Sequence, residues 1–161
     1  RIDKKGRVSV PASFRAALEA SGSPVLYVTP HHELPAIDGN SQAWMEQLVA
    51  RLDELPMFSR ERSNLEHTIL GKTRDLTLDP EGRISLPKPL LEKAGIEDQV
   101  AFVGLGRYFQ IWNPEALEAH RREAEQATIA GGLTLRSVAT VSSGSESTPR
   151  KKTRMILSRL S

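Results

Sequence analysis

The chain has 161 residues, of which 39% are hydrophobic and 26% are charged, and its formal net charge is +2. This length is enough for one domain or two small ones, and the composition is that of an ordinary soluble protein. The absence of cysteine excludes disulfides, thiolate catalysis and cysteine-based zinc sites, and agrees with a reducing cytoplasm. No apolar run reaches the roughly 18 to 20 residues that cross a bilayer, and no signal-peptide pattern is present, so we expect no membrane association.

The charge is distributed unevenly along the chain. Residues 131–161 carry six Lys or Arg against one acid, a net charge of +5, whereas the other 130 residues carry sixteen basic and nineteen acidic side chains, a net charge of −3. The basic tail is rich in Ser and has no hydrophobic periodicity, so we predict that it is disordered. Any nucleic-acid binding by the acidic body must therefore come from a local basic patch.

A nine-residue pattern occurs twice. "DKKGRVSVP" at residues 3–11 and "DPEGRISLP" at residues 79–87 share Asp, Gly, Arg, Ser and Pro at the same places. The glycine is expected to supply the positive φ of a chain reversal. The Asp, four residues before the Arg, is expected to accept backbone N–H bonds or to hold the guanidinium. The candidate loop-orienting residues are Asp3, Gly6, Asp79 and Gly82.

Two interpretations of the Asp–Arg pair remain open at this point. A guanidinium held in place suits a phosphate group or the O6/N7 edge of guanine. Alternatively, the pair only closes the loop. Charge separates the two copies, because residues 1–15 carry a net +4 and residues 79–93 a net charge of 0. The first loop is therefore the better candidate for contacting a polyanion.

In the first copy, residues 7–10 alternate polar and apolar side chains, as a half-buried strand does. Pro11 is expected at the first position of a helix that Gly22 ends, with Phe14 and Leu18 on one face. Residues 24–30 and 34–37 predict two further strands. The second copy is preceded by an alternating strand at residues 73–78, of which the first copy keeps only Ile2, so we expect that an N-terminal strand is missing.

Two helical segments are predicted between the copies, at residues 41–55 and 56–70. In the first, apolar residues recur every three or four positions and form one stripe. The stripe could belong to the core or to a contact between subunits, and the sequence does not separate these possibilities. The apolar positions are Trp44, Leu48, Leu52 and Leu55 in the first segment, and Phe58, Leu65 and Ile69 in the second.

The second copy repeats the plan of the first, and a charged helix follows it. Each unit spans about 45 residues, which is too short to bury a good core alone, so we expect the two units to pair. The expected elements are a strand at residues 83–87, a helix at 87–95 that Gly95 ends, strands at 99–104 and 108–112 joined by a tight turn, and a helix from near Pro114, capped by Asn113, to about Ile129.

No catalytic or metal-binding pattern is present, so we expect no enzymatic activity, no cofactor and no small-molecule substrate. His31 and His32 would point to opposite sides of a strand, which disfavours a shared metal. His67 has no nucleophile partner, and His120 is expected to face solvent. The "GLG" at residues 104–106 lacks the third glycine of a dinucleotide-binding loop and is typical of a hairpin turn.

The doubled D-x-x-G-R-(V/I)-S-(V/L)-P pattern resembles the tandem swapped-hairpin barrel of the SpoVT-AbrB type. With "DPEGRISLPKPLLEKAGI", "FVGLGRYFQIW" and a helical insert between the copies, the arrangement resembles the MraZ family of bacterial transcriptional regulators over about residues 1–125. The resemblance implies an α+β fold of two pseudo-repeat β-barrel halves with short helices. The expected segments are 1–44 (first SpoVT-AbrB repeat, its N-terminal strand truncated), 45–72 (helical insert), 73–116 (second repeat), 117–130 (C-terminal helix) and 131–161 (disordered basic tail).

The resemblance also implies a function. Members of this family assemble into rings, bind short direct repeats upstream of the gene cluster for cell division and wall synthesis that contains their own gene, and usually repress it. We therefore expect a cytoplasmic, nucleoid-associated homo-oligomer that binds double-stranded promoter DNA. The alternative is an antitoxin-like protein-interaction module of the same barrel class, for which the basic tail would be the argument. The candidate DNA-binding residues are Arg7 and Arg83, on which the family signature falls, and Lys4, Lys5 and Arg15, which charge adds.

Overall fold

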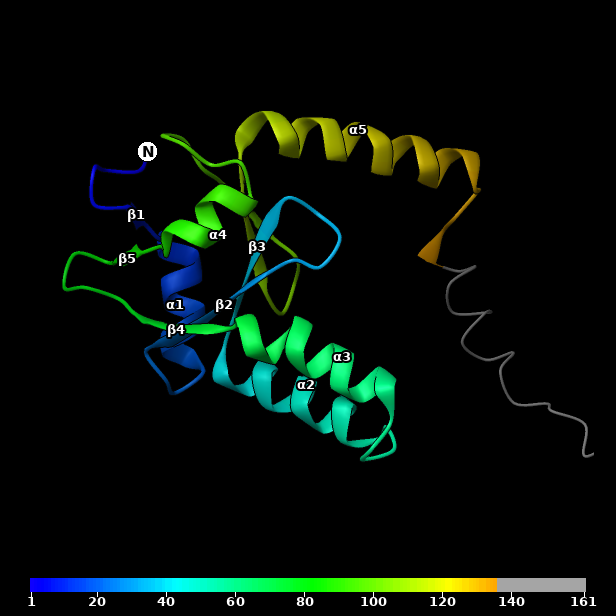
Figure 1. Cartoon of the computed structure of the whole chain (residues 1–161). Helices are drawn as coiled ribbons and strands as arrows, with labels where there is room; N and C mark the ends of the chain where they lie inside the picture. The colour runs from blue at the N-terminus through cyan, green and yellow to red at the C-terminus, as the bar shows by residue number, and fades with distance from the viewer. Residues whose placement is uncertain (136–161) are drawn as a thin grey trace, which may run out of the picture. The chain divides into compact units, whose positions relative to one another are not determined.

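The computed structural model describes residues 1–135, which contain two antiparallel sheets, five α-helices and one short 3-10 helix (Figure 1). This confirms the α+β class; the strands form two open sheets and not a closed barrel. The chain divides into two units, Arg1–His120 and Arg121–Ser161. The predicted disorder of the tail falls largely on residues 136–161, outside the described residues.

The elements follow the order expected from the repeat. In the first copy and the insert they are β1 (Arg7–Ser9), α1 (Ala12–Ala20), β2 (Val25–Pro30), β3 (Ala36–Asn40), α2 (Gln42–Asp53), α3 (Arg60–Thr68) and the 3-10 helix η1 (Leu70–Lys72). In the second copy and beyond they are β4 (Arg74–Thr77), β5 (Arg83–Ser85), α4 (Lys88–Lys93), β6 (Ala101–Gly104), β7 (Phe109–Trp112) and α5 (Pro114–Ala130).

The helix ends follow local side-chain chemistry. Gly22 and Gly95 adopt φ of +80° and +62° and follow the C-cap residues of α1 and α4, Ser21 and Ala94, so each glycine ends its helix as predicted. Ser41 caps α2 by accepting a hydrogen bond from the Trp44 amide at 3.2 Å, and the side chain of Asn113 caps α5 as expected. Pro11 lies one residue before α1 and not at its first position, with extended ψ of 143°. The proline therefore sets the direction of entry into the helix.

The two copies pair directly through β1 and β5, which form a two-stranded antiparallel ribbon. Val8 lies opposite Ile84, and both side chains are buried. Each strand is extended by a hydrogen bond to the glycine carbonyl of the opposite copy, from Val10 N to Gly82 O and from Leu86 N to Gly6 O, both at 3.0 Å. The expected pairing of the two units is confirmed.

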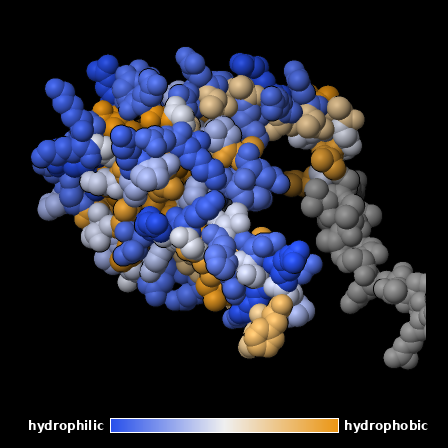
Figure 2. Space-filling view, viewed as in Figure 1, coloured by the Kyte–Doolittle hydropathy of each residue, from blue (hydrophilic) through white to orange (hydrophobic). Residues whose placement is uncertain are grey.

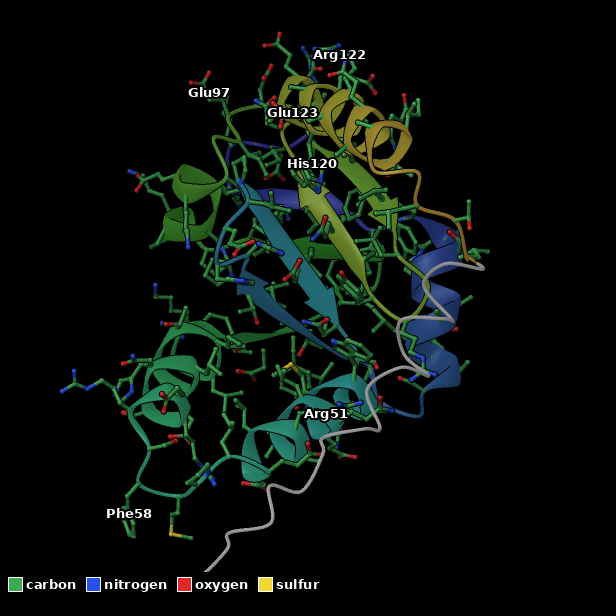
Figure 3. The ribbon with its side chains drawn as sticks, turned by 90° about the vertical axis from the view of Figure 1, so that its right-hand side faces the viewer. Arg51, Phe58, Glu97, His120, Arg122 and Glu123 are labelled. Carbon is green, nitrogen blue, oxygen red and sulfur yellow. The ribbon has the colours of Figure 1, made fainter. Side chains whose placement is uncertain are left out.

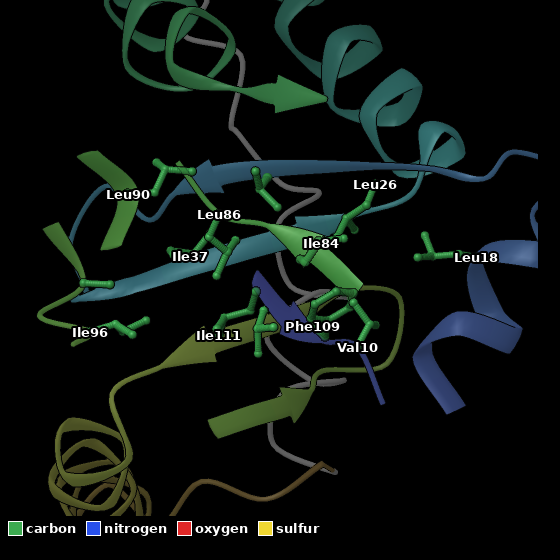
Figure 4. Packing of buried hydrophobic residues seen from close by; sticks show 13 residues of the cluster. Val10, Leu18, Leu26, Ile37, Ile84, Leu86, Leu90, Ile96, Phe109 and Ile111 are labelled. Atoms are coloured by element: carbon green, nitrogen blue, oxygen red, sulfur yellow. The ribbon is translucent and has the colours of Figure 1, made fainter. Parts of the chain in front are cut away.

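A five-stranded antiparallel sheet in the order β4-β2-β3-β7-β6 joins strands of both copies. The copies meet in this sheet at two contacts, β2 with β4, where Leu26 lies opposite Leu76, and β3 with β7, where Ile37 lies opposite Ile111. The main core lies between this sheet, the ribbon and helices α1 and α4, so neither copy has a core of its own (Figure 4). Its fully buried members include Leu26, Val28, Ile37, Ile84 and Ile111.

The helical insert differs from the prediction in one place. Leu52 is buried on α2, and Trp44 and Leu48 are half-buried, so the stripe packs partly against the domain. Phe58, by contrast, precedes α3, is 96% exposed and projects away from the helices (Figure 3). The prediction that it lies on a helical face is wrong. α3 has no buried residue and is held instead by Arg62.

Arg62 connects α3 to α2 electrostatically. Its guanidinium donates to Asp53 of α2 and to Glu66 of α3, both at 2.7 Å.

Strand β3 also differs slightly from its prediction, because it starts at Ala36 and continues to Asn40. The alternating pattern missed this extension because Asp38 and Gly39 are typical of turns.

His120 was predicted to face solvent, but in the structure its ring packs against the protein. Its ring stacks on the buried Trp112 ring, with the two centroids 5.0 Å apart and the planes 21° from parallel. Trp112 and Leu117 belong to a small second core, between β7 and the start of α5. The charged neighbours of His120 in sequence indicated an exposed helix face, but the tryptophan offers an apolar surface on which an imidazole ring can pack.

Candidate nucleic-acid interface

The first loop is built around the Asp3 carboxylate. Asp3 Oδ1 accepts the backbone N–H groups of Lys5 and Arg7, both at 2.9 Å, and Oδ2 accepts Arg7 Nε at 2.7 Å. The Gly6 amide donates to the Asp3 carbonyl at 3.0 Å, and Gly6 has φ of +74°. Both interpretations of the carboxylate are thus realised together: it closes the turn and it orients the guanidinium.

The second loop has the same construction. Asp79 Oδ1 accepts the backbone N–H groups of Glu81 and Arg83, both at 2.9 Å, and Oδ2 accepts Arg83 Nε at 2.8 Å. Gly82 has φ of +76°, and its amide donates to the Asp79 carbonyl at 2.9 Å. In both loops the carboxylate accepts a hydrogen bond from the arginine Nε, so this bond leaves the terminal nitrogens of the guanidinium for other partners.

Hydrogen bonding keeps both carboxylates charged. The N–H of Arg7 lowers the pKa of Asp3 below its ordinary value, and the N–H of Arg83 does the same for Asp79; partial desolvation opposes each shift. The hydrogen bond to Asp79 raises the pKa of Arg83. Each loop therefore holds its carboxylate in the ionised form at neutral pH.

Pairing of β1 with β5 brings the two arginines onto one surface. Arg7 lies opposite Ser85, and Ser9 lies opposite Arg83, while Val8 and Ile84 point into the core. Alternate residues of a strand share a face, so the outer face of the ribbon presents two arginines and two serines in a two-fold pattern. Arg7 and Arg83 are diagonal neighbours on this face, a relationship that places their Cα atoms roughly 7–8 Å apart. We call these four residues, Arg7, Ser9, Arg83 and Ser85, the ribbon face.

The shape and polarity of the ribbon face suit a nucleic acid. The major groove of B-DNA admits a two-stranded ribbon, and Arg and Ser side chains both donate to base edges and phosphates. Figure 2 shows that hydrophilic side chains dominate the part of the surface where Figure 1 places β1 and β5. The sequence analysis did not include Ser9 and Ser85 among the candidate DNA-binding residues. The available signal was that both copies of the repeat have a serine at this outward-facing strand position.

The two arginines have different surroundings. Arg83 makes a second ion pair, from Nη2 to Glu81 Oε2 at 2.7 Å. Within residues 1–135, Arg7 makes an ion pair with Asp3 alone, and Lys4 and Lys5 are exposed and take part in no ion pair. The first loop therefore presents more uncompensated positive charge than the second, in line with the charge difference in the sequence.

Arg15 is the predicted DNA-binding residue whose side chain lies at a different loop from the one expected. It was grouped with the first loop because of its position in sequence, but its side chain lies across Gly82 of the second loop: a Cβ atom at Gly82 would lie 2.7 Å from Arg15 Cδ. The matching position in the second copy is Leu91, which lies near Gly6 of the first loop. Each helix thus covers the loop of the other copy, and Arg15 adds its charge beside Arg83.

The histidines and the other glycine motif form no catalytic arrangement. His31 and His32 stack on each other in the β2–β3 connection, and His67 Nδ1 contacts the Ser63 carbonyl at 2.8 Å. Leu105 donates to the Tyr108 carbonyl in a tight turn, as expected for the "GLG" segment. Residues 1–135 contain no group of three or more His, Cys, Asp or Glu side chains placed to hold a metal ion.

Comparison with known proteins agrees with these observations. Residues 69–132 match the family described as "MraZ protein, putative antitoxin-like". The Transcriptional regulator MraZ of Xanthobacter autotrophicus is 44% identical over 126 residues, which cover 78% of the chain and 80% of that protein. The chain belongs to the MraZ family. Proteins of the same name from Gluconobacter oxydans (45% over 130 residues, 79% of both chains) and Rhodospirillum rubrum (42% over 134 residues, 82% of this chain and 86% of that one) belong to it as well.

Membership of the MraZ family makes this chain a relative of transcriptional regulators over most of its length. The family-model match, residues 69–132, covers the second copy of the repeat and the whole of α5. None of the helices within residues 1–135 is both long and apolar enough to cross a bilayer.

Proposed function

We propose that this MraZ-family protein is a sequence-specific DNA-binding repressor that contacts promoter DNA through the ribbon face. The observation that carries the proposal is the pair of arginines, each held by a carboxylate through Nε and both presented on the outer side of β1 and β5. A guanidinium oriented in this way can bind the O6/N7 edge of guanine or a phosphate with little further loss of side-chain entropy.

The two loops have different roles in this proposal. Arg7, with Lys4 and Lys5 beside it, makes the stronger contact, because each arginine pairs with its loop aspartate but Arg83 pairs with Glu81 as well. Arg15 contributes a phosphate contact from its place over Gly82. Ser85 lies opposite Arg7 and Ser9 lies opposite Arg83 on the ribbon face, and both serines donate hydrogen bonds to bases or phosphates.

The wider proposal is that several subunits act together. One subunit offers only a few phosphate contacts, and the net charge of residues 1–130 is −3, so a single ribbon face would bind weakly. A ring of subunits that engages evenly spaced direct repeats would gain avidity of about 10² to 10⁴ if the geometry allows simultaneous contact. We propose such a ring, acting at the promoter of the protein's own division and cell-wall gene cluster, in the cytoplasm at the nucleoid. We propose that its domains are the segments 1–44, 45–72, 73–116, 117–130 and 131–161.

The test is a binding titration of the full chain on its own upstream DNA over a series of salt concentrations. The expected result is sequence-specific binding whose affinity falls steeply with salt and whose salt dependence flattens in Arg7→Ala. Size-exclusion chromatography with light scattering gives the oligomeric mass of both proteins in parallel. Normal binding by both Arg7→Ala and Arg83→Ala would show that the ribbon face is the wrong surface.

The second candidate is a protein-interaction module, which the words "antitoxin-like" in the family description favour. Its function would depend on the basic tail rather than on the ribbon face. Removal of residues 131–161 separates the two candidates, because an interaction borne by the tail would be lost whereas DNA binding through the ribbon face would remain. No catalytic role is part of either proposal.

A further inference from the structure

A cavity of about 210 Å³ lies where helix α4 meets the end of β2 and the start of β4. Three basic side chains line it: Lys72 at the end of η1, Arg74 at the start of β4 and Lys93 at the end of α4. Among residues 1–135, no acidic side chain contributes to its lining. Residues 1–130 together have a net charge of −3, so this cavity is a locally positive place on an acidic body.

The acidic residues next to these basic ones in sequence do not neutralise the cavity. Asp75 follows Arg74, but consecutive residues of a strand point to opposite faces, and Asp75 lines a different cavity, beside α2. Glu92 precedes Lys93, and its Oε1 lies 3.7 Å from Lys88 Nζ. Within residues 1–135, none of the three basic side chains of the cavity makes an ion pair.

Arg74 is held in place by backbone atoms next to it. Its Nη1 donates to the Thr73 carbonyl at 2.8 Å and to the Gly71 carbonyl at 3.4 Å. Both acceptors are neutral, so they restrict the guanidinium without compensating its charge. An arginine that is already restricted in this way can bind an oxyanion with little further loss of side-chain entropy.

The rest of the cavity wall is apolar and rigid. It consists of Pro30, Pro87, Pro89 and Leu90, of which Pro30 and Leu90 are buried. A proline ring has a fixed φ and almost no side-chain entropy to lose when a ligand packs on it. The cavity is smaller than the roughly 300–1,000 Å³ of sites for drug-sized molecules. It therefore suits one small ring next to a charged group.

We propose that this cavity binds a phosphomonoester, in which the phosphate group is attached to one small ring. The phosphate accepts hydrogen bonds from Arg74, Lys72 and Lys93, and the ring packs on the proline wall. A phosphate ester carries a charge of about −1.5 to −2 at pH 7 and three acceptor oxygens, so it matches three basic groups better than a carboxylate does. The planar fork of an arginine can also bind two phosphate oxygens at once.

This site is separate from the ribbon face. Arg74 begins β4, whereas the second loop follows the other end of that strand. Five residues of extended chain lie between Arg74 and Asp79, a span of roughly 16 Å. The proposed ligand site therefore does not depend on the proposed DNA binding.

Calorimetric titration of the full chain at pH 7.5 with phenyl phosphate, benzoate, phenol and inorganic phosphate tests the proposal. Phenyl phosphate should bind saturably, benzoate and inorganic phosphate at least about tenfold more weakly, and phenol not at all. Equal binding of benzoate would overturn the assignment to a phosphate. Equal binding of inorganic phosphate would overturn the assignment to an ester with a ring, and absence of saturable phenyl phosphate binding at millimolar concentration would overturn the site.

Substitutions assign the binding to named groups. Arg74→Gln and Lys93→Gln should each weaken phenyl phosphate binding about tenfold, because each removes a charged donor. Arg74→Lys keeps the charge without the fork and should lose less. Arg51→Gln, at an exposed position of α2 outside this cavity, is the control with the same change in charge. Equal affinity of Arg74→Gln and Arg51→Gln would refute the site.

The substituted residues are all exposed, so the variants should fold like the unaltered protein. Thermal unfolding of each variant checks this, and an unchanged unfolding temperature makes any loss of binding a property of the cavity itself.

The phosphate backbone of DNA is the other source of the same chemistry. Binding of labelled promoter DNA by the double variant Lys72→Gln/Lys93→Gln separates the two sources, with Arg51→Gln/Arg60→Gln as the control of equal charge. Equal DNA affinity of the two double variants supports a free ligand. Weaker binding by the cavity variant would show that the cavity takes a DNA phosphate, and it would overturn the assignment to a small molecule. The calorimetric titration contains no DNA, so its result is independent of the proposed function.

Discussion

The loops at residues 3–7 and 79–83 have nearly the same geometry and different charge. Their five corresponding hydrogen bonds agree in length to within 0.1 Å, and the glycine φ values are +74° and +76°. Positions 4 and 5 are Lys-Lys in the first loop, whereas the second has Pro80 and Glu81. The Asp, Gly and Arg side chains and the backbone set the shape of the loop, so the intervening residues are free to set its charge.

The largest expected effect is the loss of DNA binding on removing Arg7. If the first loop makes the stronger contact, Arg7→Ala should raise the Kd for the promoter array at least about 100-fold, because each oriented arginine contributes about 1–3 kcal/mol and the loss recurs in every subunit. Arg83→Ala should raise it only about tenfold, since Glu81 already engages that guanidinium. Fluorescence anisotropy on labelled DNA measures both constants.

Arg7→Lys is the control for geometry. It keeps the charge but loses the planar fork, so non-specific binding to unrelated DNA should persist while the preference for the promoter repeats falls. Equal losses in Arg7→Ala and Arg83→Ala would show that the two loops are equivalent contacts, contrary to the comparison above.

Substituting alanine for Gly6 or for Gly82 should reduce stability by different amounts, because different atoms pack against the two glycines. A Cβ at Gly6 would lie 3.2 Å from the Leu86 carbonyl oxygen, which is backbone and cannot move away, whereas a Cβ at Gly82 would displace the flexible end of Arg15. Both changes add the cost of positive φ, about 1–2 kcal/mol. Gly6→Ala should therefore destabilise by about 2 kcal/mol and Gly82→Ala by about 1 kcal/mol. Urea denaturation measures the difference, and a larger loss for Gly82→Ala would contradict the proposed packing.

Glu81→Gln should make the second loop more like the first. The substitution removes the ion pair with Arg83 Nη2 and one negative charge beside the ribbon face. DNA affinity should rise about threefold and the salt dependence should steepen slightly. Glu97→Gln, an exposed position in the turn before β6, serves as the control for net charge. A gain of equal size in the control would mean that only the overall charge matters.

The smallest expected effect is on stability in acid. The pKa values of Asp3 and Asp79 are lowered in the folded protein by backbone N–H groups, so both carboxylates favour folding above their unfolded pKa of about 3.9. This contribution is lost as the pH falls through the lower folded values. Asp3→Asn and Asp79→Asn should therefore lose stability at pH 7 and should show a smaller difference from the unaltered protein at pH 3.

Thermal unfolding at the two pH values checks this prediction, with Asp75→Asn as the exposed control. Because the two loops have the same hydrogen bonds, the two variants should change by similar amounts. A clear difference between Asp3→Asn and Asp79→Asn would mean that the charged neighbours, and not the shared backbone, dominate the loops.

Much of the fold could be predicted because its signals are short-range. The repeat predicted the glycine turns, the strands that follow them and the Asp–Arg pairs four residues apart, and the structure contains all of these. The exposure of Phe58 and the packing of His120 were predicted wrongly, because each depends on what lies beside the residue in space. The assignment of Lys4, Lys5, Arg7, Arg15 and Arg83 to DNA stays a prediction.

The sequence by itself determined the two loops, since five consecutive residues, with their Asp, Gly and Arg, contain every donor and acceptor of the turn's internal hydrogen bonds. Only the tertiary structure decided where those loops lie. Pairing of β1 with β5, 76 residues apart, placed Arg7 and Arg83 on one face, and the crossing of α1 over the second loop placed Arg15 beside Gly82. Neither arrangement is encoded locally, because both follow from the need of two short units to bury one shared core.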